Sequence, residues 1–175
     1  RSPERLAEVS RLGGVHLSGP ISGFGRLETI TTDIGEAIDG ADVIMVVLPA
    51  VGHRTIAEAC APYLTDGQVI VLNPGRTGGA LEFNATLLEK GVRARVTVAE
   101  AQTFIFASRT VGPAQSRIFG LKYDVPVAAL PASATPAVVE MLRKVFPQFS
   151  AAESVLKTRF DNIGAIFHPA PTLLN

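Results

Sequence analysis

Val43-Ile-Met-Val-Val-Leu48 and Gln68-Val-Ile-Val-Leu72 decide the fold of this 175-residue chain. Both runs are continuously apolar and rich in β-branched residues, which is typical of parallel strands that are covered on both faces. A third strand is expected over 96–99, and helices are expected over 53–63 and 80–89. Strands that alternate with helices in this way predict an α/β fold with a doubly wound, mostly parallel sheet.

The segments on either side of this centre carry weaker signals. Before it, a helix is expected to start at Ser2-Pro3-Glu4, followed by short strands over 15–17 and 25–30 and a helix capped by Thr32-Asp33. After it, the sequence predicts added antiparallel strands over 103–111, 115–121 and 125–130, then an amphipathic helix over 136–146. A longer helix, beginning near Lys157, is expected to open a different domain.

Composition excludes several classes of function. Apolar residues make up 47% of the chain and charged residues 18%, and the formal net charge is zero, so we expect a globular protein with neither a nucleic-acid nor a membrane partner. Its longest strongly apolar run, 43–51, is too short to cross a bilayer. Cys60 is the only cysteine, which excludes a disulfide or a cysteine-based zinc site within one chain and fits a reducing cytoplasm. No metal site is predicted.

Two loops follow the apolar strands and are the first candidates for a ligand site. In open α/β sheets, ligands bind beyond the carboxyl ends of the strands. The two loops are Leu48-Pro-Ala-Val-Gly-His53 and Leu72-Asn-Pro-Gly-Arg-Thr-Gly-Gly79. Cofactor contacts are therefore expected from Leu48, Pro49, Ala50, His53, Asn73, Pro74 and Gly75. The alternatives are a well-formed αβ loop, which also favours Asn, Pro and Gly, and a surface or capping role for His53.

The second loop is not a phosphate-binding P-loop, because no Gly-Lys-Ser/Thr follows. Its Asn73 side chain offers an amide to a ribose or carboxamide, and its glycines let the backbone approach a ligand closely. Glu100-Ala-Gln-Thr103 follows the third strand, so Glu100 is a further cofactor candidate and Thr103 a substrate candidate. A solvated turn is the alternative for this run.

His168 is the strongest candidate for a catalytic group. It lies in an apolar, helix-like stretch and is followed by Pro169 and Pro171, which remove backbone donors and kink a helix. Histidine has the unperturbed pKa best suited to proton transfer near neutral pH. Asn162 and Thr172 lie on either side of it and are candidate substrate contacts. The alternative is that His168 only packs in the apolar core.

These motifs together resemble the opine dehydrogenase (octopine/nopaline dehydrogenase) family. The resemblance rests on 162–175, which is similar to the start of that family's helical domain, and on 43–49, 72–82 and 100–103, which are similar to the later half of its Rossmann domain. It implies that 1–153 is a partial NAD(P)-binding domain lacking its first βα unit. It also implies that 154–175 is the first helix of a truncated helical domain like that of 6-phosphogluconate dehydrogenase.

The resemblance further implies an NAD- or NADP-dependent oxidoreductase that reductively condenses an amino acid with a 2-oxo acid. His168 matches the family's proton-transferring histidine. The Asp that assists it and the glycine-rich dinucleotide fingerprint have no counterpart in this chain, so we expect the fragment to be inactive alone. We assign Arg1 to the cofactor, because an arginine after the second strand accommodates an NADP 2′-phosphate. An ordinary exposed arginine is the alternative.

Other readings stay open. A ketopantoate reductase or glycerol-3-phosphate dehydrogenase would share the architecture, but these enzymes usually depend on a lysine on the corresponding helix, and Lys157 lies eleven residues before His168. A dinucleotide-binding module without turnover is the third reading. The N-terminus has no initiating Met, which indicates either a missing upstream piece or a processed terminus. Missing strands would leave a sheet edge unpaired, so we expect the isolated chain to form homo-oligomers or to be poorly soluble.

Overall fold

A computed structural model describes residues 3–75 and 78–161. The chain divides into two units: residues 1–40 with 105–123, and residues 41–104 with 124–175. Each unit therefore combines two separate stretches of sequence, and the stretch 105–123 interrupts the larger unit.

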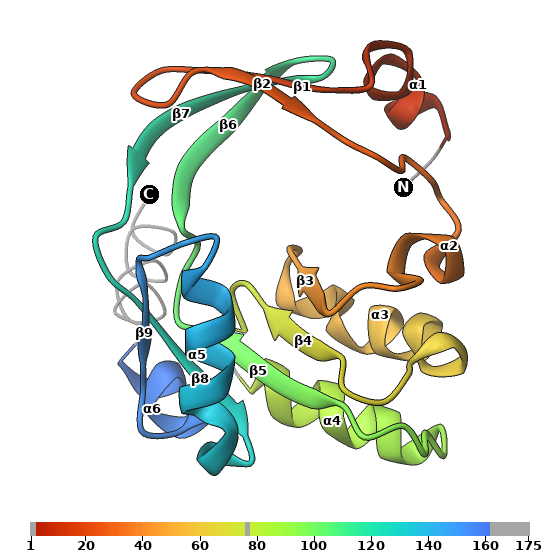
Figure 1. The fold of residues 1–175 in the computed structure, drawn as a ribbon, viewed down its shortest axis with the longest axis vertical. Helices are drawn as coiled ribbons and strands as arrows, with labels where there is room; N and C mark the ends of the chain where they lie inside the picture. The colour runs from red at the N-terminus through yellow and green to blue at the C-terminus, as the bar shows by residue number, and fades with distance from the viewer. Residues whose placement is uncertain (1–2, 76–77, 162–175) are drawn as a thin grey trace, which may run out of the picture. The chain divides into compact units, whose positions relative to one another are not determined.

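The larger unit contains a five-stranded sheet with the strand order β3-β4-β5-β8-β9 (Figure 1). Its strands are β3 (Val43–Val46), β4 (Val69–Leu72), β5 (Thr97–Ala101), β8 (Val125–Leu130) and β9 (Phe149–Ala151). Strands β3, β4 and β5 are parallel, β8 is antiparallel to β5, and β9 is parallel to β8. The predicted parallel core with an added antiparallel strand is confirmed.

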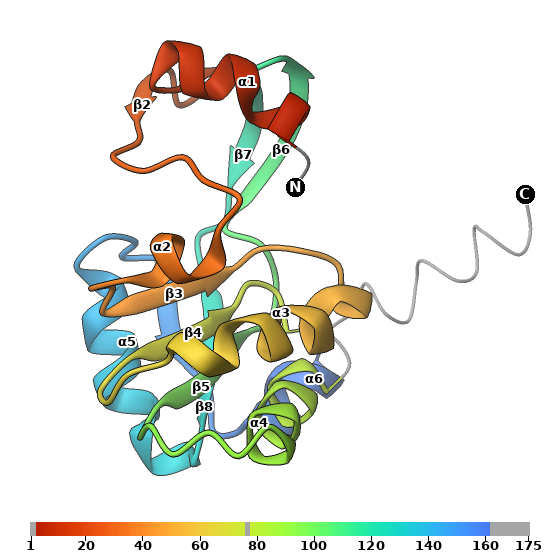
Figure 2. The ribbon, with the colours of Figure 1, turned by 90° about the vertical axis from the view of Figure 1, so that its right-hand side faces the viewer.

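Helices cover both faces of this sheet. Figures 1 and 2 show α3 and α4 on one face and α5 on the other. The helices of this unit are α3 (His53–Cys60), α4 (Gly79–Glu89), α5 (Thr135–Arg143) and α6 (Val155–Phe160), with short 3₁₀ turns at Ala50–Gly52, Ala61–Tyr63 and Ala132–Ala134. The doubly wound arrangement predicted from the alternating pattern is therefore present.

Strand β4 forms the centre of the core. Its side chains Ile70, Val71 and Leu72 are fully buried, and Phe83 of α4 is buried with them. A strand that lies between two parallel neighbours and beneath helices has no solvent-facing side, which explains why its sequence lacks the alternation of a half-exposed strand.

The smaller unit contains a four-stranded sheet with the order β2-β1-β7-β6. Its elements are α1 (Pro3–Leu12), β1 (Gly14–Ser18), β2 (Gly23–Arg26), α2 (Ile34–Ile38), β6 (Phe106–Gly112) and β7 (Gln115–Leu121). β1 and β2 pair antiparallel, as do β6 and β7, while β1 and β7 pair in parallel. The predicted cap of the short helix is confirmed, because the Asp33 side chain accepts a hydrogen bond from the Glu36 N–H at 3.0 Å.

Several element boundaries differ from the sequence prediction. β2 ends at Arg26 rather than at residue 30, and β6 starts at Phe106 rather than at Thr103. The ladder between β5 and β8 ends with the bond from Gln102 N–H to the Pro126 carbonyl. Thr103 comes after this last bond and lies in a bend. α5 ends at Arg143 rather than at residue 146, where bonds to the carbonyl three residues back tighten the last turn.

The start of the last helix agrees with its sequence. α6 begins at Val155, and the side chain of Ser154 caps it by accepting a hydrogen bond from Lys157 N–H at 3.3 Å. The expected continuation of this helix lies in residues 162–175, outside the described residues, so the domain boundary after residue 153 stays a prediction. Within 3–75 and 78–161, no helix is both long and apolar enough to span a bilayer.

Candidate functional site

The three parallel strands end at one edge of the sheet. Their register pairs Val46 of β3 with Leu72 of β4, and Leu72 with Glu100 of β5. The backbone continues this alignment, because Asn73 N–H donates to the Val46 carbonyl at 2.9 Å and Gly75 N–H donates to the Ala101 carbonyl at 3.0 Å. The two candidate ligand loops, after β3 and after β4, therefore begin side by side at the carboxyl ends of neighbouring strands.

The loop after β3 leads into α3. Leu48 and Ala50 are half-buried and Pro49 is exposed. Gly52 packs closely on this loop, since a Cβ at this position would lie 2.3 Å from the Leu48 Cδ1 atom and the leucine side chain would have to shift. The loop thus combines a packed turn with one exposed segment.

His53 begins α3 and is completely buried. Neither of its ring nitrogens has a hydrogen-bond partner among the described residues. Burial lowers the pKa of His53, and the Glu82 carboxylate opposes that change. Because the ring is completely buried, the alternative of a surface position is excluded.

The loop after β4 is also buried at its start. Asn73 is 3% exposed; its Nδ2 donates a weak hydrogen bond to Met45 Sδ at 3.6 Å, and its Oδ1 has no partner among the described residues. Pro74 and Gly75 are buried beside it. Burying an amide oxygen without a hydrogen-bond partner costs on the order of 1–3 kcal/mol of folding free energy. The Asn73 and His53 side chains therefore both carry polar atoms without partners near the carboxyl ends of β3 and β4.

α4 begins without a side-chain cap from its own segment. Its N-cap residue is Gly78, with a left-handed φ of +78°, a conformation that favours glycine. The free amide of Ala80 donates instead to Oε2 of Glu100 at 2.9 Å. A carboxyl group from β5 thus caps a helix through an amide that lies twenty residues earlier in the sequence.

Glu100 is 1% exposed, and both of its oxygens are engaged. Oε1 lies 2.7 Å from the Thr158 hydroxyl on α6. Burial raises the pKa of Glu100, while the bonds from Ala80 and Thr158 and the positive charge of Arg159 oppose this rise. The solvated-turn alternative does not hold for Glu100, although Thr103 is half-buried and lies in a bend.

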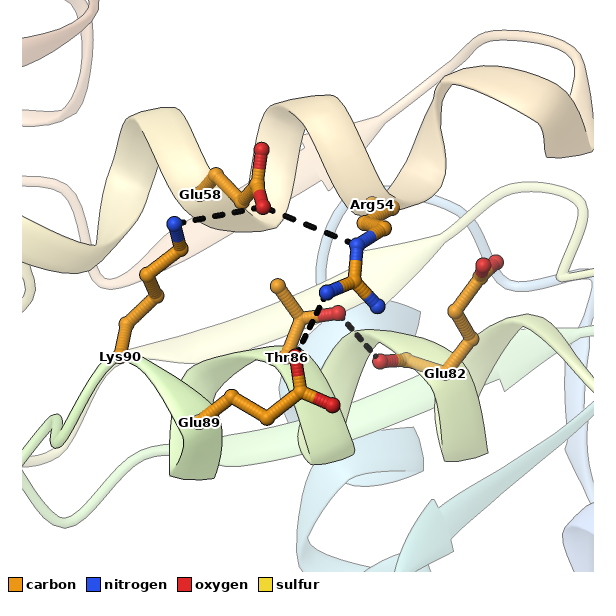
Figure 3. Close-up of polar contacts among 6 residues, drawn as sticks. All are labelled: Arg54, Glu58, Glu82, Thr86, Glu89 and Lys90. Carbon is orange, nitrogen blue, oxygen red and sulfur yellow. Dashed lines mark hydrogen bonds and ion pairs between the residues drawn. The ribbon is translucent and has the colours of Figure 1, made fainter.

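Ion pairs join α3 and α4 (Figure 3). Arg54 Nη2 lies 2.6 Å from Glu89 Oε2 and Arg54 Nε lies 3.6 Å from Glu58 Oε1, while Lys90 Nζ lies 3.3 Å from the same Glu58 oxygen. These side chains are about half exposed, so solvent screens the pairs. On α4 itself, the Thr86 hydroxyl donates to the Glu82 carbonyl at 2.8 Å.

Some predicted site residues lie outside the described residues: Arg1, Asn162, His168 and Thr172. Sequence reasoning missed Thr158, which contacts Glu100. The sequence could have indicated Thr158 only through its spacing: it is a polar residue three positions after Val155, on the same buried side of a short helix. Within 3–75 and 78–161, no cluster of His, Cys, Asp and Glu side chains could hold a metal ion.

Comparison with known proteins gives a consistent result. No family model matches the chain. It is 40% identical over 173 residues to the opine dehydrogenase of Arthrobacter sp. (strain 1C), a match that covers 98% of this chain and 48% of that protein. It is 33% identical over 100 residues to the octopine dehydrogenase of Pecten maximus, covering 57% of this chain and 23% of that one. The resemblance seen in the sequence is confirmed, and the chain spans about half the length of the first of these relatives.

Solved structures show the same fold. An octopine dehydrogenase with NADH and pyruvate superimposes with a TM-score of 0.78 at 24% identity, covering 97% of this chain and 46% of that one. A yersinopine dehydrogenase with NADP⁺ bound gives a TM-score of 0.72 at 14% identity, covering 95% and 43%. A ketopantoate reductase from Ralstonia eutropha JMP134 gives a TM-score of 0.62 at 16% identity, covering 88% and 47%.

Proposed function

We propose that this chain is part of an opine dehydrogenase, an NAD- or NADP-dependent oxidoreductase that joins an amino acid to a 2-oxo acid. The identity of 40% over 98% of the chain carries the proposal. In the reaction, the amino group condenses with the oxo group, water leaves, and hydride and a proton reduce the resulting C=N bond to a secondary amine. The nicotinamide cofactor supplies the hydride, and the protein positions the reactants and manages protons.

The loops at the carboxyl ends of β3 and β4 would hold the nicotinamide cofactor. This agrees with the general rule for open α/β sheets, and the unpaired Oδ1 of Asn73 and ring nitrogens of His53 are polar atoms that a bound cofactor would suit. The remaining contacts are assigned to Leu48, Pro49, Ala50, Pro74 and Gly75. Glu100 was also predicted to contact the cofactor, but both of its carboxyl oxygens are bonded within the protein, to Ala80 and Thr158. Arg1 is assigned to an NADP 2′-phosphate, and a clear preference for NADH in steady-state KM values would reject that assignment.

His168 is assigned the proton transfer at the substrate nitrogen or oxygen. Thr103, Asn162 and Thr172 are assigned to the substrate. In this proposal, residues 1–153 belong to a partial dinucleotide-binding domain and 154–175 start a helical domain. The cytoplasm is the proposed location, since the lone Cys60 is buried and no disulfide is possible within one chain. The isolated chain is expected to self-associate through the β3 edge, which has no partner beyond β4 among the described residues.

The test is a substrate panel on a protein that contains this chain. Pyruvate and individual amino acids are supplied with NADH or NADPH, loss of the reduced cofactor is followed, and the product is identified by mass spectrometry. The expected result is cofactor oxidation that requires both substrates and yields a secondary amine. Oxidation with an oxo acid alone would support a reductase of the ketopantoate type instead, and cofactor binding without turnover would support a non-catalytic module.

A ketopantoate reductase or glycerol-3-phosphate dehydrogenase activity remains the second candidate. The ketopantoate reductase fold favours it, as does 35% identity over 68 residues to a glycerol-3-phosphate dehydrogenase of Agathobacter rectalis. The lysine that such enzymes would use is represented here by Lys157, whose Nζ lies 3.4 Å from Asp161 Oδ2 in a half-exposed ion pair. This pairing and the shorter match place the second candidate below the first.

A further inference from the structure

The carboxyl group of Glu100 is enclosed by three segments of the larger unit. It projects from β5, and its Oε2 accepts the Ala80 N–H at the start of α4. The Cα of Gly75 lies directly against it, since a Cβ there would fall 2.3 Å from the Glu100 Cβ and 2.6 Å from Oε2. Thr158 of α6 bonds the other oxygen. Glu100 therefore links α6 to the carboxyl end of β5.

The geometry around Thr158 bears on the protonation of Glu100. Its Oγ1 is 2.7 Å from Glu100 Oε1 and 2.9 Å from the carbonyl oxygen of Val155. A hydroxyl has one proton, so it cannot donate to a carboxylate and a carbonyl at once. If Glu100 Oε1 carries a proton and donates it to Thr158 Oγ1, the hydroxyl can donate its own proton to Val155. Every polar atom of the group is then satisfied.

We propose that Glu100 is a protonated carboxylic acid and a positioning residue, which fixes α6, the helix that precedes His168 in the sequence, against the end of β5. The proposal rests on the proposed function, because it assigns His168 the proton transfer. A second bond at the same place supports it: Gln102 Nε2 donates to the Asp161 carbonyl at 2.7 Å, just after α6. Burial raises the pKa of Glu100, while the bonds with Ala80 and Thr158 and the positive charge of Arg159 oppose this rise.

The functional consequence of these bonds concerns the position of α6. Thr158 and Asp161 are bonded to two residues near the end of β5, and the chain continues from Asp161 to His168. A catalytic group displaced by about 1 Å can lose about 10²-fold in rate. Loosening α6 should therefore lower kcat while leaving cofactor affinity largely intact.

Two pairs of variants test the proposal in a protein that contains this chain. Glu100→Gln keeps a donor for Thr158 and an acceptor for Ala80, whereas Glu100→Ala removes both. Thr158→Ser keeps the hydroxyl, whereas Thr158→Val removes it. We expect the Gln and Ser variants to retain kcat within about threefold, and the Ala and Val variants to lose about 10–100-fold with little change in KM for the cofactor. If Glu100→Gln is as damaging as Glu100→Ala, Glu100 acts as an ionised group and the proposal fails.

Hydrogen exchange provides a readout that does not need activity. Amides of 155–160 should exchange faster in Thr158→Val than in the parent protein. Thr86→Val is the matched control, because it removes another buried hydroxyl that donates to a carbonyl of its own helix, and it should leave exchange at 155–160 unchanged. Unchanged exchange in Thr158→Val would overturn the link to α6, and faster exchange with unchanged kcat would overturn its positioning role.

These readouts separate the two proposals. If the parent protein makes no opine, the proposed function fails, while the exchange data still decide whether Glu100 and Thr158 hold α6. The proton itself is tested by infrared spectroscopy near neutral pH. A protonated-carboxyl band that disappears in Glu100→Gln is expected, and its absence from the parent protein would show an ionised Glu100 and reject the proposal.

Discussion

The Cα of Gly79 lies against the imidazole of His53: a methyl group there would fall 2.7 Å from Nδ1 and 2.8 Å from Cε1. The first residue of α4 and the first residue of α3 therefore pack directly on each other. This contact explains two features of the sequence at once. The glycine provides space, and the histidine fills it without exposing its ring to water.

Gly79→Ala is expected to destabilise the protein. The new methyl group would also lie 3.1 Å from Leu72 Cδ1, so relief of the His53 contact is restricted. Overpacking costs about 1–3 kcal/mol, which outweighs the gain of up to about 1 kcal/mol from replacing glycine in a helix. Urea denaturation measures the difference. Gly120→Ala, which meets no atom within 4 Å, is the control and should have little effect; equal stability of the two variants would contradict the prediction.

The stability of the protein should fall on the acid side because of His53. Burial lowers its pKa in the folded state below the ordinary value of 6.5, so below that pH the unfolded chain binds a proton that the folded chain does not. The free energy of unfolding should therefore decrease as the pH falls from about 6.5 toward the folded-state pKa. Denaturant titrations over this range should show a shallower slope for His53→Gln. If His53→Gln keeps the slope of the parent protein, another group is responsible.

The ion pair between Arg54 and Glu89 should contribute little and depend on salt (Figure 3). Its N···O distance is 2.6 Å, but both side chains are about half exposed. A double-mutant cycle with Arg54→Ala and Glu89→Ala should give a small favourable coupling in the free energy of unfolding at low ionic strength. That coupling should vanish at high salt, because ions screen exposed charges. A large coupling that persists in high salt would mean that the pair is desolvated in solution.

His168→Asn should slow the chemical step in a protein that contains this chain. Loss of a general acid–base group lowers kcat by roughly 10²–10⁴-fold, and the dissociation constant of NADH or NADPH should remain near that of the parent. Steady-state kinetics and a fluorescence titration of the cofactor check the two halves of the prediction. An unchanged kcat would remove His168 from the mechanism.

Local patterns were sufficient for the centre of the fold. The apolar runs at 43–48 and 68–72 predict buried parallel strands because burial on both faces removes any need for alternation, and the structure has β3 and β4 there. The cap at Asp33 followed from the chemistry of one side chain. The resemblance to opine dehydrogenases came from short motifs and was confirmed across the chain.

Long-range relationships were not predictable from those patterns. Glu100 is followed in the sequence by polar residues, as in a solvated turn, but its partners lie 20 and 58 positions away. β6 and β7 were recognised as strands, yet the pairing of β7 with β1 joins segments about a hundred residues apart. Contacts of this kind are set by topology, and no periodicity in a single segment encodes them.

The ladder between β5 and β8 pairs Ala101 with Val127 and is extended by the bond from Gln102 to Pro126. Geometrically this is an antiparallel hairpin whose connection has been expanded to carry residues 105–123 into the smaller unit. That stretch is thus an insertion that leaves and re-enters the larger unit at a single hairpin end. A deletion joined by a tight turn would preserve the ladder between β5 and β8, and the larger unit would then be one continuous stretch of sequence that starts near Ala41.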